Sequence, residues 1–516
     1  MYCGDETGSY IGDIGSHSCR FGYGGEDNPK LVVPSYVIRN KQQMASSCLS
    51  SRMATQELDS ILRRPIITEN AEGGQPIITD PSAFLVQGDS VANWEALQIA
   101  WDTSMETLHA KDTLKHTKGG TPYSTITTTT TSHAGTMTSS TIKSTSASNP
   151  GDGGGKCVHP ILAVTPAFTH LVGYGPEYCE TVRRQQYIQY TEMLMESMDA
   201  SSMFLAPSSM LSAFSLGRQT ALMVDIGAGG CRVTPIVDGL VLEHAQRRNG
   251  RGAEWLNHCI WKALVNVEKK NPQPLYQVRA AGGKHKLIEQ TEPIRNVHPL
   301  YRQWAMQEYM FQIRTAPFVT LAAWNQGKED RIPFGPSPSS TQGSDSSSAS
   351  MSAMGGNQSQ IYELPDGTTI DLSTTTGKDF TRVPELLFTD AVPFDHTTPS
   401  SALYTLSDLP LHKMIQQSLL AVADVDVRKE LAGCICLVGG ASIVGNLEAR
   451  LSAELTSLLP TMVKPKVVAS RNSIERSCAA WIGASILSSL GSFQQLWLSR
   501  TEYEEYGTTL SIQRFP

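Results

Sequence analysis

Two glycine-centred stretches, more than two hundred residues apart, carry residue types that can hold a polyphosphate. One runs from Asp13 to Arg20 and reads DIGSHSCR, and the other runs from Asp225 to Cys231 and reads DIGAGGC. Glycine in a tight turn lets backbone N–H groups point into a concavity, where they can donate to phosphate oxygens. A divalent ion bound to a nucleotide keeps several waters and needs only one or two carboxylates, which Asp13 and Asp225 could supply through water. The duplication predicts a two-lobed clamp around a nucleotide and its Mg²⁺.

A third glycine element favours this interpretation. An aspartate two residues before a glycine also occurs in ordinary hairpin turns, and that alternative stays open for either stretch taken alone. Residues 433–442 (GCICLVGGAS), however, form an apolar run that ends in a glycine pair and small residues. Such a strand-to-helix junction lets a ligand approach the backbone closely. We therefore expect Gly439, Gly440 and Ala441 to complete the binding site.

The order of these three elements resembles the actin superfamily. The most specific match is residues 481–497 (WIGASILSSLGSFQQLW), which are similar to the actin signature almost residue for residue. Shorter similar stretches occur at residues 22–27, 34–35, 93–94, 159–162, 362–367 and 424–428. The resemblance covers most of the chain outside two low-complexity inserts and a region from about Asn266 to Pro333. It implies an α/β, actin-like ATPase fold, with two ribonuclease-H-like lobes around a cleft that binds ATP and Mg²⁺.

Chain length agrees with two lobes, because 516 residues are too many for one core and predict at least two packed units. With the resemblance, we expect a first lobe of residues 1–216 plus 470–516 and a second lobe of residues 217–469. The small subdomains would span about residues 42–90 in the first lobe and about 252–340 in the second.

Two stretches lack the apolar periodicity that folding requires. Residues 111–156 are rich in Thr, Ser and Gly, and residues 336–360 are rich in Ser with scattered Gly and Pro. Both are expected to be disordered surface inserts, which a compact protein tolerates because the cost of closing a loop grows slowly with its length. Composition alone leaves open whether they are phosphorylated tethers or padding, and it favours padding.

In the segment between the inserts, the spacing of apolar residues alternates between that of strands and that of helices. The pattern predicts strands at Cys157–Phe168 and Ala221–Asp225, and helices at Thr181–Met198 and from Met210 to near Gly217. Alternating strands and helices are typical of α/β architecture.

Charge and composition exclude several classes of function. The net charge of −7, without clustered Lys or Arg, argues against direct nucleic-acid binding. No apolar run reaches the length of a membrane span and the start does not resemble an export signal, so an intracellular protein without a membrane partner is expected. The ten cysteines show no CxxC pair or zinc-ligand spacing, which favours reduced thiols, and Cys434 and Cys436 would share a buried face of a strand.

Relative to conventional actin, three positions of the phosphate site differ. The actin glutamine that orients the attacking water is replaced by Ser208, which is too short for that role. Ala228 stands where actin has an aspartate, and His17 stands at a glycine whose backbone approaches the γ-phosphate. The resemblance implies that the other cofactor-binding residues are Gly15, Ser16, Ser18, Arg20, Gly227 and Gly229. We expect ATP binding with little or no hydrolysis and no catalytic residue, and the alternative is an empty cleft.

Within the superfamily, the chain is most similar to the nuclear actin-related proteins of the fourth class, the actin-like protein six type of animals. The features are Ala228, residues 299–304 (PLYRQW) followed by a helix to Val319, and the ending at 491–495 and 502–505, which conventional actin shares. That class implies a scaffold subunit of nuclear chromatin-remodelling and histone-acetyltransferase complexes. Such a subunit pairs with nuclear actin on a helical segment of a remodeller ATPase or acetyltransferase scaffold, and it contacts histones.

A partner helix needs an apolar groove. The family positions that line this groove are all apolar here, namely Phe214, Leu216, Leu487, Leu490 and Leu496. The spacing of the three leucines from 487 to 496 is also that of an internal core, so both interpretations stay open.

A divergent cytoskeletal actin that hydrolyses ATP and forms or caps filaments is the second hypothesis. Residues 41–66 show nothing like the patterned inter-subunit loop of actin, so we do not expect a homopolymer. Nuclear residence follows only from the resemblance. The sequence shows no extended basic import run, so the chain could enter the nucleus with a partner, and the cytoplasm is the alternative location.

Overall fold

The computed structural model describes residues 8–36, 67–69, 76–78, 85–87, 90–91, 93–116, 159–165, 176–270, 272–274, 278–281, 284–287, 299–317, 319, 321, 333, 361–364, 366–390 and 409–515. Residues 117–156, the insert at 336–360 and the segment at 41–66 lie outside this part. Most of the expected small subdomain at 42–90 does too.

The first sheet has six strands and collects both ends of the chain. In it β1 pairs antiparallel with β2 and parallel with β8, so the sheet is mixed. The strand order is β20 (Leu498–Ser499), β9 (Ser202–Pro207), β8 (Ile161–Thr165), β1 (Tyr10–Ile14), β2 (Ser18–Tyr23) and β3 (Leu31–Pro34).

The second sheet repeats the arrangement of the first. Here β10 pairs antiparallel with β11 and parallel with β18, as β1 does with β2 and β8. The strand order is β12 (Leu240–Val241), β11 (Cys231–Val237), β10 (Ala221–Ile226), β18 (Ile435–Val438) and β19 (Val467–Ala469), and β13 (Arg247–Asn249) also pairs with β11.

The register shows how close the repeat is. Asp13 lies opposite Arg20 across the β1–β2 hairpin, and Asp225 lies opposite Arg232 across the β10–β11 hairpin. Both aspartates therefore take equivalent positions at the carboxyl ends of two equivalent strands. This duplication is the two-lobed α/β fold that the sequence predicts, while the lobe boundaries at residues 216 and 470 stay a prediction.

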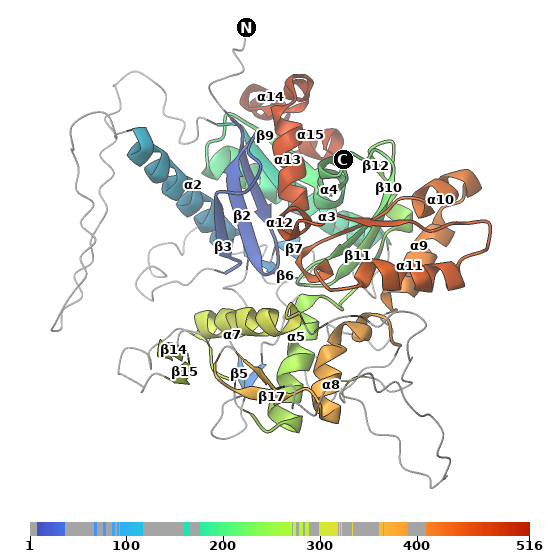
Figure 1. The fold of residues 1–516 in the computed structure, drawn as a ribbon. Coiled ribbons are helices and arrows are strands. Elements are labelled where there is room, and N and C mark those ends of the chain that lie inside the picture. The colour runs from blue at the N-terminus through green and yellow to red at the C-terminus, as the bar shows by residue number, and fades with distance from the viewer. Residues whose placement is uncertain are drawn as a thin grey trace, which may run out of the picture.

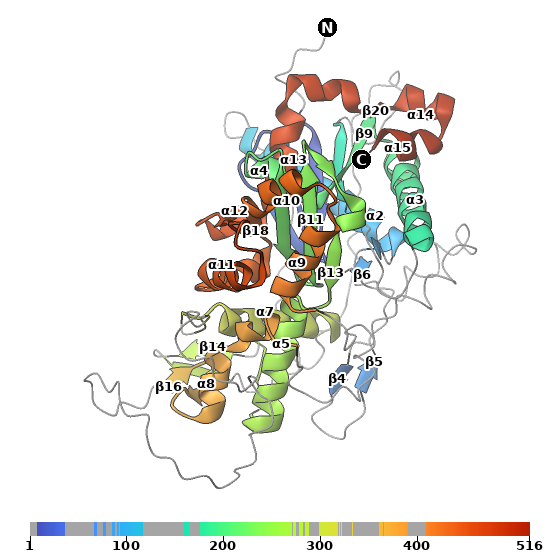
Figure 2. The ribbon, with the colours of Figure 1, turned by 90° about the vertical axis from the view of Figure 1, so that its right-hand side faces the viewer.

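Helices cover the sheets and extend below them. Figure 1 shows α5, α7 and α8 beneath the two sheets, and Figure 2 shows α4 beside α13 and α3 beside α15. The helices are α2 (Trp94–His116), α3 (Pro176–Glu192), α4 (Ser208–Ser215), α5 (Ala253–Lys262), α7 (Pro299–Arg314), α8 (Thr375–Thr381), α9 (Leu411–Ala421), α10 (Val425–Ala432), α11 (Leu447–Leu458), α12 (Ser473–Ser477), α13 (Ala479–Ser489), α14 (Arg500–Tyr506) and α15 (Thr509–Arg514).

Short elements complete the described part. The two-stranded ribbons are β4 (Ile67–Glu69) with β5 (Pro76–Ile78), β6 (Val86–Gln87) with β7 (Ser90–Val91), β14 (Val278–Ala281) with β15 (Lys284–Leu287) and β16 (Ile361–Glu363) with β17 (Thr369–Asp371). The 3₁₀ turns are η4 (Glu243–Ala245), η7 (Val383–Leu387), η9 (Gly440–Ser442) and η10 (Gly491–Leu496), and the π-helical turns are η3 (Met193–Ser197) and η5 (Ala263–Val267).

The predicted elements between the inserts are confirmed with different boundaries. The predicted strands are β8 and β10, and the predicted helices are α3 with η3 and α4. Two expected boundaries are wrong. Helix α2 continues past Lys111 to His116, because the Thr-rich composition begins only after a stretch that contains good helix formers. Helix α7 ends at Arg314 rather than near Val319, because Pro317 disfavours helical geometry in the residue before it.

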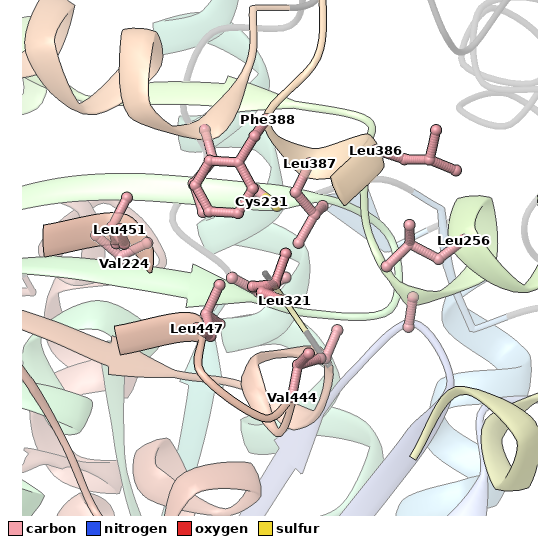
Figure 3. Close-up of a cluster of buried hydrophobic side chains, with 14 of the residues drawn as sticks. Val224, Cys231, Leu256, Leu321, Leu386, Leu387, Phe388, Val444, Leu447 and Leu451 are labelled. Atoms are coloured by element: carbon pink, nitrogen blue, oxygen red, sulfur yellow. The ribbon is translucent and has the colours of Figure 1, made fainter. Parts of the chain in front are cut away.

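Separate hydrophobic cores support the two sheets. Figure 3 shows the core of the second sheet, in which Val224 of β10 and Cys231 of β11 lie among side chains such as Leu447 and Leu451 of α11. A second cluster packs around the first sheet and includes Trp101 and Trp481, both fully buried. The cores arise because both faces of each central strand carry apolar side chains that helices cover.

A third, smaller cluster joins the two halves. It contains Ala213 of α4, Met223 of β10, Cys436 of β18 and Ala479 of α13. The chain crosses between the sheets at α4 and again near α13, so small buried side chains set the spacing of the two halves at both crossings.

The cysteines behave largely as expected. Among the described residues, Cys19, Cys231, Cys259, Cys434, Cys436 and Cys478 are free thiols. Cys434 and Cys436 have sulfur atoms 3.8 Å apart, but only Cys436 is fully buried. Cys434 lies just before β18, where the strand is less covered. In the described part of the chain, no helix is long and apolar enough to cross a membrane.

The contact between α13 and α4 tolerates no side chain at one position. A Cβ atom on Gly483 would lie 1.7 Å from the carbonyl oxygen of Leu211. Gly483→Ala should therefore destabilise the protein by about 2 kcal/mol or more, although alanine normally favours a helix interior by about 1 kcal/mol. The free energy of unfolding in urea measures the effect. Gly491→Ala, whose Cβ meets nothing within 4 Å, is the control, and equal stability of the two variants would contradict the prediction.

Candidate functional site

A cavity of about 330 Å³ lies where the two equivalent hairpins approach one another. This volume is within the range of small-ligand sites, which is about 300–1,000 Å³. Its walls come from the β1–β2 turn, the β10–β11 turn, the junction after β18, and helices α4, α5 and α7.

All of the phosphate-binding and metal-binding residues expected from the sequence line this cavity, and so does Ser208, at the position of the actin glutamine. They are Asp13, Gly15, Ser16, His17, Ser18, Arg20, Ser208, Asp225, Gly227, Ala228, Gly229, Gly439, Gly440 and Ala441. The structure thus brings together residues that are spread over most of the chain. Their individual roles toward a ligand stay predictions.

The first turn is closed by its own backbone. The N–H of Gly15 donates to the carbonyl of Ser18 over 3.2 Å, and a Cβ on Gly15 would lie 2.8 Å from that oxygen. Asp13, only 8% exposed, forms an ion pair with Arg20 at 3.1 Å between Oδ2 and Nη1. Burial also raises the pKa of the Cys19 thiol to about 12, so this thiol beside the turn stays protonated.

The second turn has the same closure and is also tied to α5. The N–H of Gly227 donates to the carbonyl of Gly230 over 3.0 Å. The first backbone amides of α5, from Ala253 and Glu254, donate to the carbonyls of Gly227 and Ala228 over 2.9 and 3.1 Å. Helix α5 therefore fixes the orientation of this turn.

The two aspartates are suited to a divalent ion held through water. Each hairpin pairs its aspartate with an arginine through Oδ2, and the distance from Asp225 to Arg232 is 3.5 Å. Within the described ranges, no group of three or more His, Cys, Asp or Glu side chains could hold a metal directly. Two cavity-facing carboxylates match an ion whose other ligands are water and phosphate, as Mg²⁺ prefers.

The third element brings its backbone close to the second turn. Gly439 has a φ of +90°, and a Cβ there would lie 2.3 Å from Oδ1 of Asp225. A Cβ on Gly440 would meet nothing within 4 Å. The first of the two glycines is thus required by geometry, and the second leaves the cavity wall open.

Gly439→Ala should weaken nucleotide binding about tenfold or more, because it strains the backbone and displaces the Asp225 carboxylate. Calorimetric titration with Mg²⁺ and ATP measures the dissociation constant. Gly491→Ala, at a glycine that does not line the cavity and whose Cβ would meet nothing within 4 Å, is the control. If both variants bind as the wild type does, the close approach at Gly439 is not part of the site.

Several cavity residues were missed by the sequence interpretation. The equal spacing of Asp13 to Arg20 and Asp225 to Arg232 was a usable signal for the second arginine. Glu308 was not predictable, because its side chain reaches His17 across 291 residues of sequence.

A buried arginine from α7 was also missed. Arg314 is 2% exposed, its Nε donates to Oδ1 of Asn257 over 3.3 Å, and Asn257 in turn donates to Oε1 of Gln307 over 2.8 Å. Its Nη1 has no hydrogen-bond partner in the described part of the chain. Burial lowers the pKa of Arg314 to about 10, so the guanidinium is still charged at neutral pH. This donor-only group can donate a hydrogen bond to a ligand atom that carries a lone pair.

The five expected groove residues divide into two kinds. Leu490 and Leu496 are 44% and 52% exposed, whereas Leu487 is 7% exposed and belongs to the core around the first sheet. Phe214 and Leu216, at the end of α4, are partly buried. Leu490 and Leu496 therefore offer apolar surface at the ends of α13 and η10, and Leu487 packs inside.

Two equivalent hairpins that face one cavity from separate sheets define a two-lobed nucleotide-binding class of α/β proteins. The profile of the actin family, described as Actin, matches residues 4–516. The chain therefore belongs to the actin family, whose fold binds a nucleotide, generally ATP with Mg²⁺.

Several curated relatives match the whole chain. The chain is 27% identical over 521 residues to Actin-related protein 4 of Oryza sativa subsp. indica, with 100% of both chains covered. It is 26% identical over 533 residues to Actin-related protein 4 of Arabidopsis thaliana, again with 100% of both covered. It is 27% identical over 518 residues to Actin-related protein 4 of Yarrowia lipolytica, with 100% of this chain and 97% of the relative covered.

Proposed function

We propose that this chain is a nucleotide-binding, actin-related scaffold subunit of nuclear chromatin-remodelling and histone-acetyltransferase complexes, which holds ATP without hydrolysing it. The observation that carries the nucleotide part is the cavity itself, because both glycine turns, both aspartates and Gly439 line it together. The relatives named Actin-related protein 4 support the nuclear scaffold part.

Lack of hydrolysis is inferred from the side chains at two positions. Ser208 lies at the start of α4 and lines the cavity, but its hydroxyl is two bonds shorter in reach than a glutamine amide. Ala228 contributes no polar side-chain atom at the second turn. Hydrolysis needs a group that orients the attacking water, and neither residue has the length or chemistry for it. A bound nucleotide would then act as a wedge that holds the two lobes closed.

Purified protein should bind Mg²⁺ and ATP but release phosphate slowly, at a rate per molecule that does not change with protein concentration. Calorimetry tests binding, and a phosphate-release assay over a range of concentrations tests turnover. Conventional actin is the positive control for both. Turnover that accelerates with concentration would instead favour the hypothesis of a filament-forming or filament-capping cytoskeletal ATPase.

The proposed partner surface depends on exposed apolar side chains near α4 and α13, where the chain passes between the two sheets. An amphipathic helix can dock on such a surface through a few anchors spaced by turns. Leu490 and Leu496 offer about half of their surface each, and Leu216 and Phe214 lie partly exposed at the end of the adjoining helix α4. We assign this surface to a helical segment of a remodeller ATPase or acetyltransferase scaffold, with nuclear actin beside it and histones as further partners.

A tagged chain purified from nuclear extract should recover actin together with a remodelling ATPase or acetyltransferase scaffold. Leu490→Asp combined with Leu496→Asp should reduce that recovery about tenfold or more, since charges would replace two anchors at the centre of the contact. Quantitative mass spectrometry measures the recovery. Leu240→Asp changes a leucine that is 67% exposed elsewhere and is the control. Equal recovery with all variants would refute this surface as the docking site.

A further inference from the structure

One side-chain contact joins the two sides of the cavity at its phosphate end. Nε2 of His17, in the β1–β2 turn, lies 2.7 Å from Oε1 of Glu308 in α7. An ionised carboxylate can only accept, so His17 donates this hydrogen bond. We call the pair the His17–Glu308 bridge. Figure 1 shows α7 beneath the strands of the first sheet, and the bridge spans that separation.

A tryptophan on the same helix supports the imidazole ring. The rings of His17 and Trp304 are stacked, with centroids 6.3 Å apart and planes 14° from parallel. Trp304 precedes Glu308 by one helical turn, so the two side chains lie on one face of α7. Trp304 therefore fixes the plane of the imidazole ring, and Glu308 fixes the position of its Nε2 atom.

The bridge lies at the rim of the cavity and remains accessible. The side chains of His17 and Glu308 both line the cavity, and they are 29% and 35% exposed. A ligand in the cavity can therefore contact both His17 and Glu308 without any rearrangement of the hydrophobic cores.

The carboxylate of Glu308 lies beside the first glycine turn, where the negative charge of a bound polyphosphate would be repelled. The glycine turns offer N–H groups to phosphates, but the tip of the first turn also carries a carboxylate held over it by His17. The Nε2–H of His17 cannot fully serve Glu308 and a phosphate oxygen at once. A phosphate near the tip must therefore displace the carboxylate or approach it against repulsion.

This geometry points to the His17–Glu308 bridge as a selectivity element that disfavours a nucleoside triphosphate relative to the corresponding diphosphate. The inference rests on the proposed nucleotide binding in the same cavity. The terminal phosphate is the group farthest from the nucleoside, and in the proposed binding mode it would meet the tip of the first turn beside the bridge. A diphosphate lacks that group, so it leaves the bridge intact. Glu308 is here a positioning and specificity residue, and it is not catalytic.

The test measures dissociation constants of ATP and ADP, each with Mg²⁺, for the wild type and Glu308→Gln. The glutamine keeps the size and one acceptor but removes the charge. The ratio of ATP affinity to ADP affinity should rise about threefold to fivefold, the range that one partly exposed charge pair supplies. Glu308→Ala should shift the ratio in the same direction, and unfolding midpoints of both variants verify that they are folded.

Glu254→Gln is the matched control, because Glu254 is a second carboxylate that lines the same cavity, from α5. It should change both affinities alike and leave their ratio as in the wild type. An unchanged ratio in both Glu308 variants would overturn the inference and leave nucleotide binding standing. An equal rise in the Glu254 variant would also overturn it, since the effect would then come from the overall charge of the cavity. If the wild type binds neither nucleotide, the proposed function and this inference both fail.

Discussion

The backbone contact between α13 and α4 is the constraint on which the rest of the structure depends. Gly483 lies against the carbonyl of Leu211, and no side chain fits at that position. Helix α4 precedes β10 of the second sheet, and α13 follows β19 of that sheet after the short helix α12, so this contact sets where the second sheet lies relative to the first. The relative position of the sheets in turn makes the two phosphate turns face one another.

In the cavity, the backbone determines the shape of the phosphate turns, and the side chains determine which ligand groups can bind. The turns close through Gly15 and Gly227, and α5 holds the second turn by two amide hydrogen bonds. These features require only glycines and neighbouring secondary structure. The side chains then set what the cavity does with a ligand: two arginines neutralise the aspartates, Ser208 is short, and His17 extends across to α7. The backbone thus shapes the cavity, and the chemistry of the cavity depends on these few side chains.

Local patterns predicted the frame well. The glycine turns, strands β8 and β10, helix α4 and the junction at Gly439 all follow from runs of neighbouring residues, because turn chemistry and periodicity are local properties. The duplicated turns also predicted a two-lobed nucleotide clamp, and the resemblance to actin supported it, although spacing alone does not show that residues near 15, 227 and 439 meet.

The sequence could not reveal contacts made by α7. Its residues read as an ordinary helix, and the partners of Glu308 and Arg314 depend on tertiary placement. The groove positions were ambiguous for a related reason. Leu487 and Leu490 are three residues apart, yet one is 7% and the other 44% exposed, because α13 ends between them at Ser489.

Arg314 has a consequence for the stability of the protein in the cell. The guanidinium is buried and its Nη1 has no partner among the described residues, so a ligand atom with a lone pair would gain a hydrogen bond there without displacing a protein partner. Any bound molecule that places a lone pair there makes this contact only in the folded chain. Occupancy of the cavity and folding are therefore thermodynamically linked, so a ligand that binds beside Arg314 would raise the free energy of unfolding as its concentration increases.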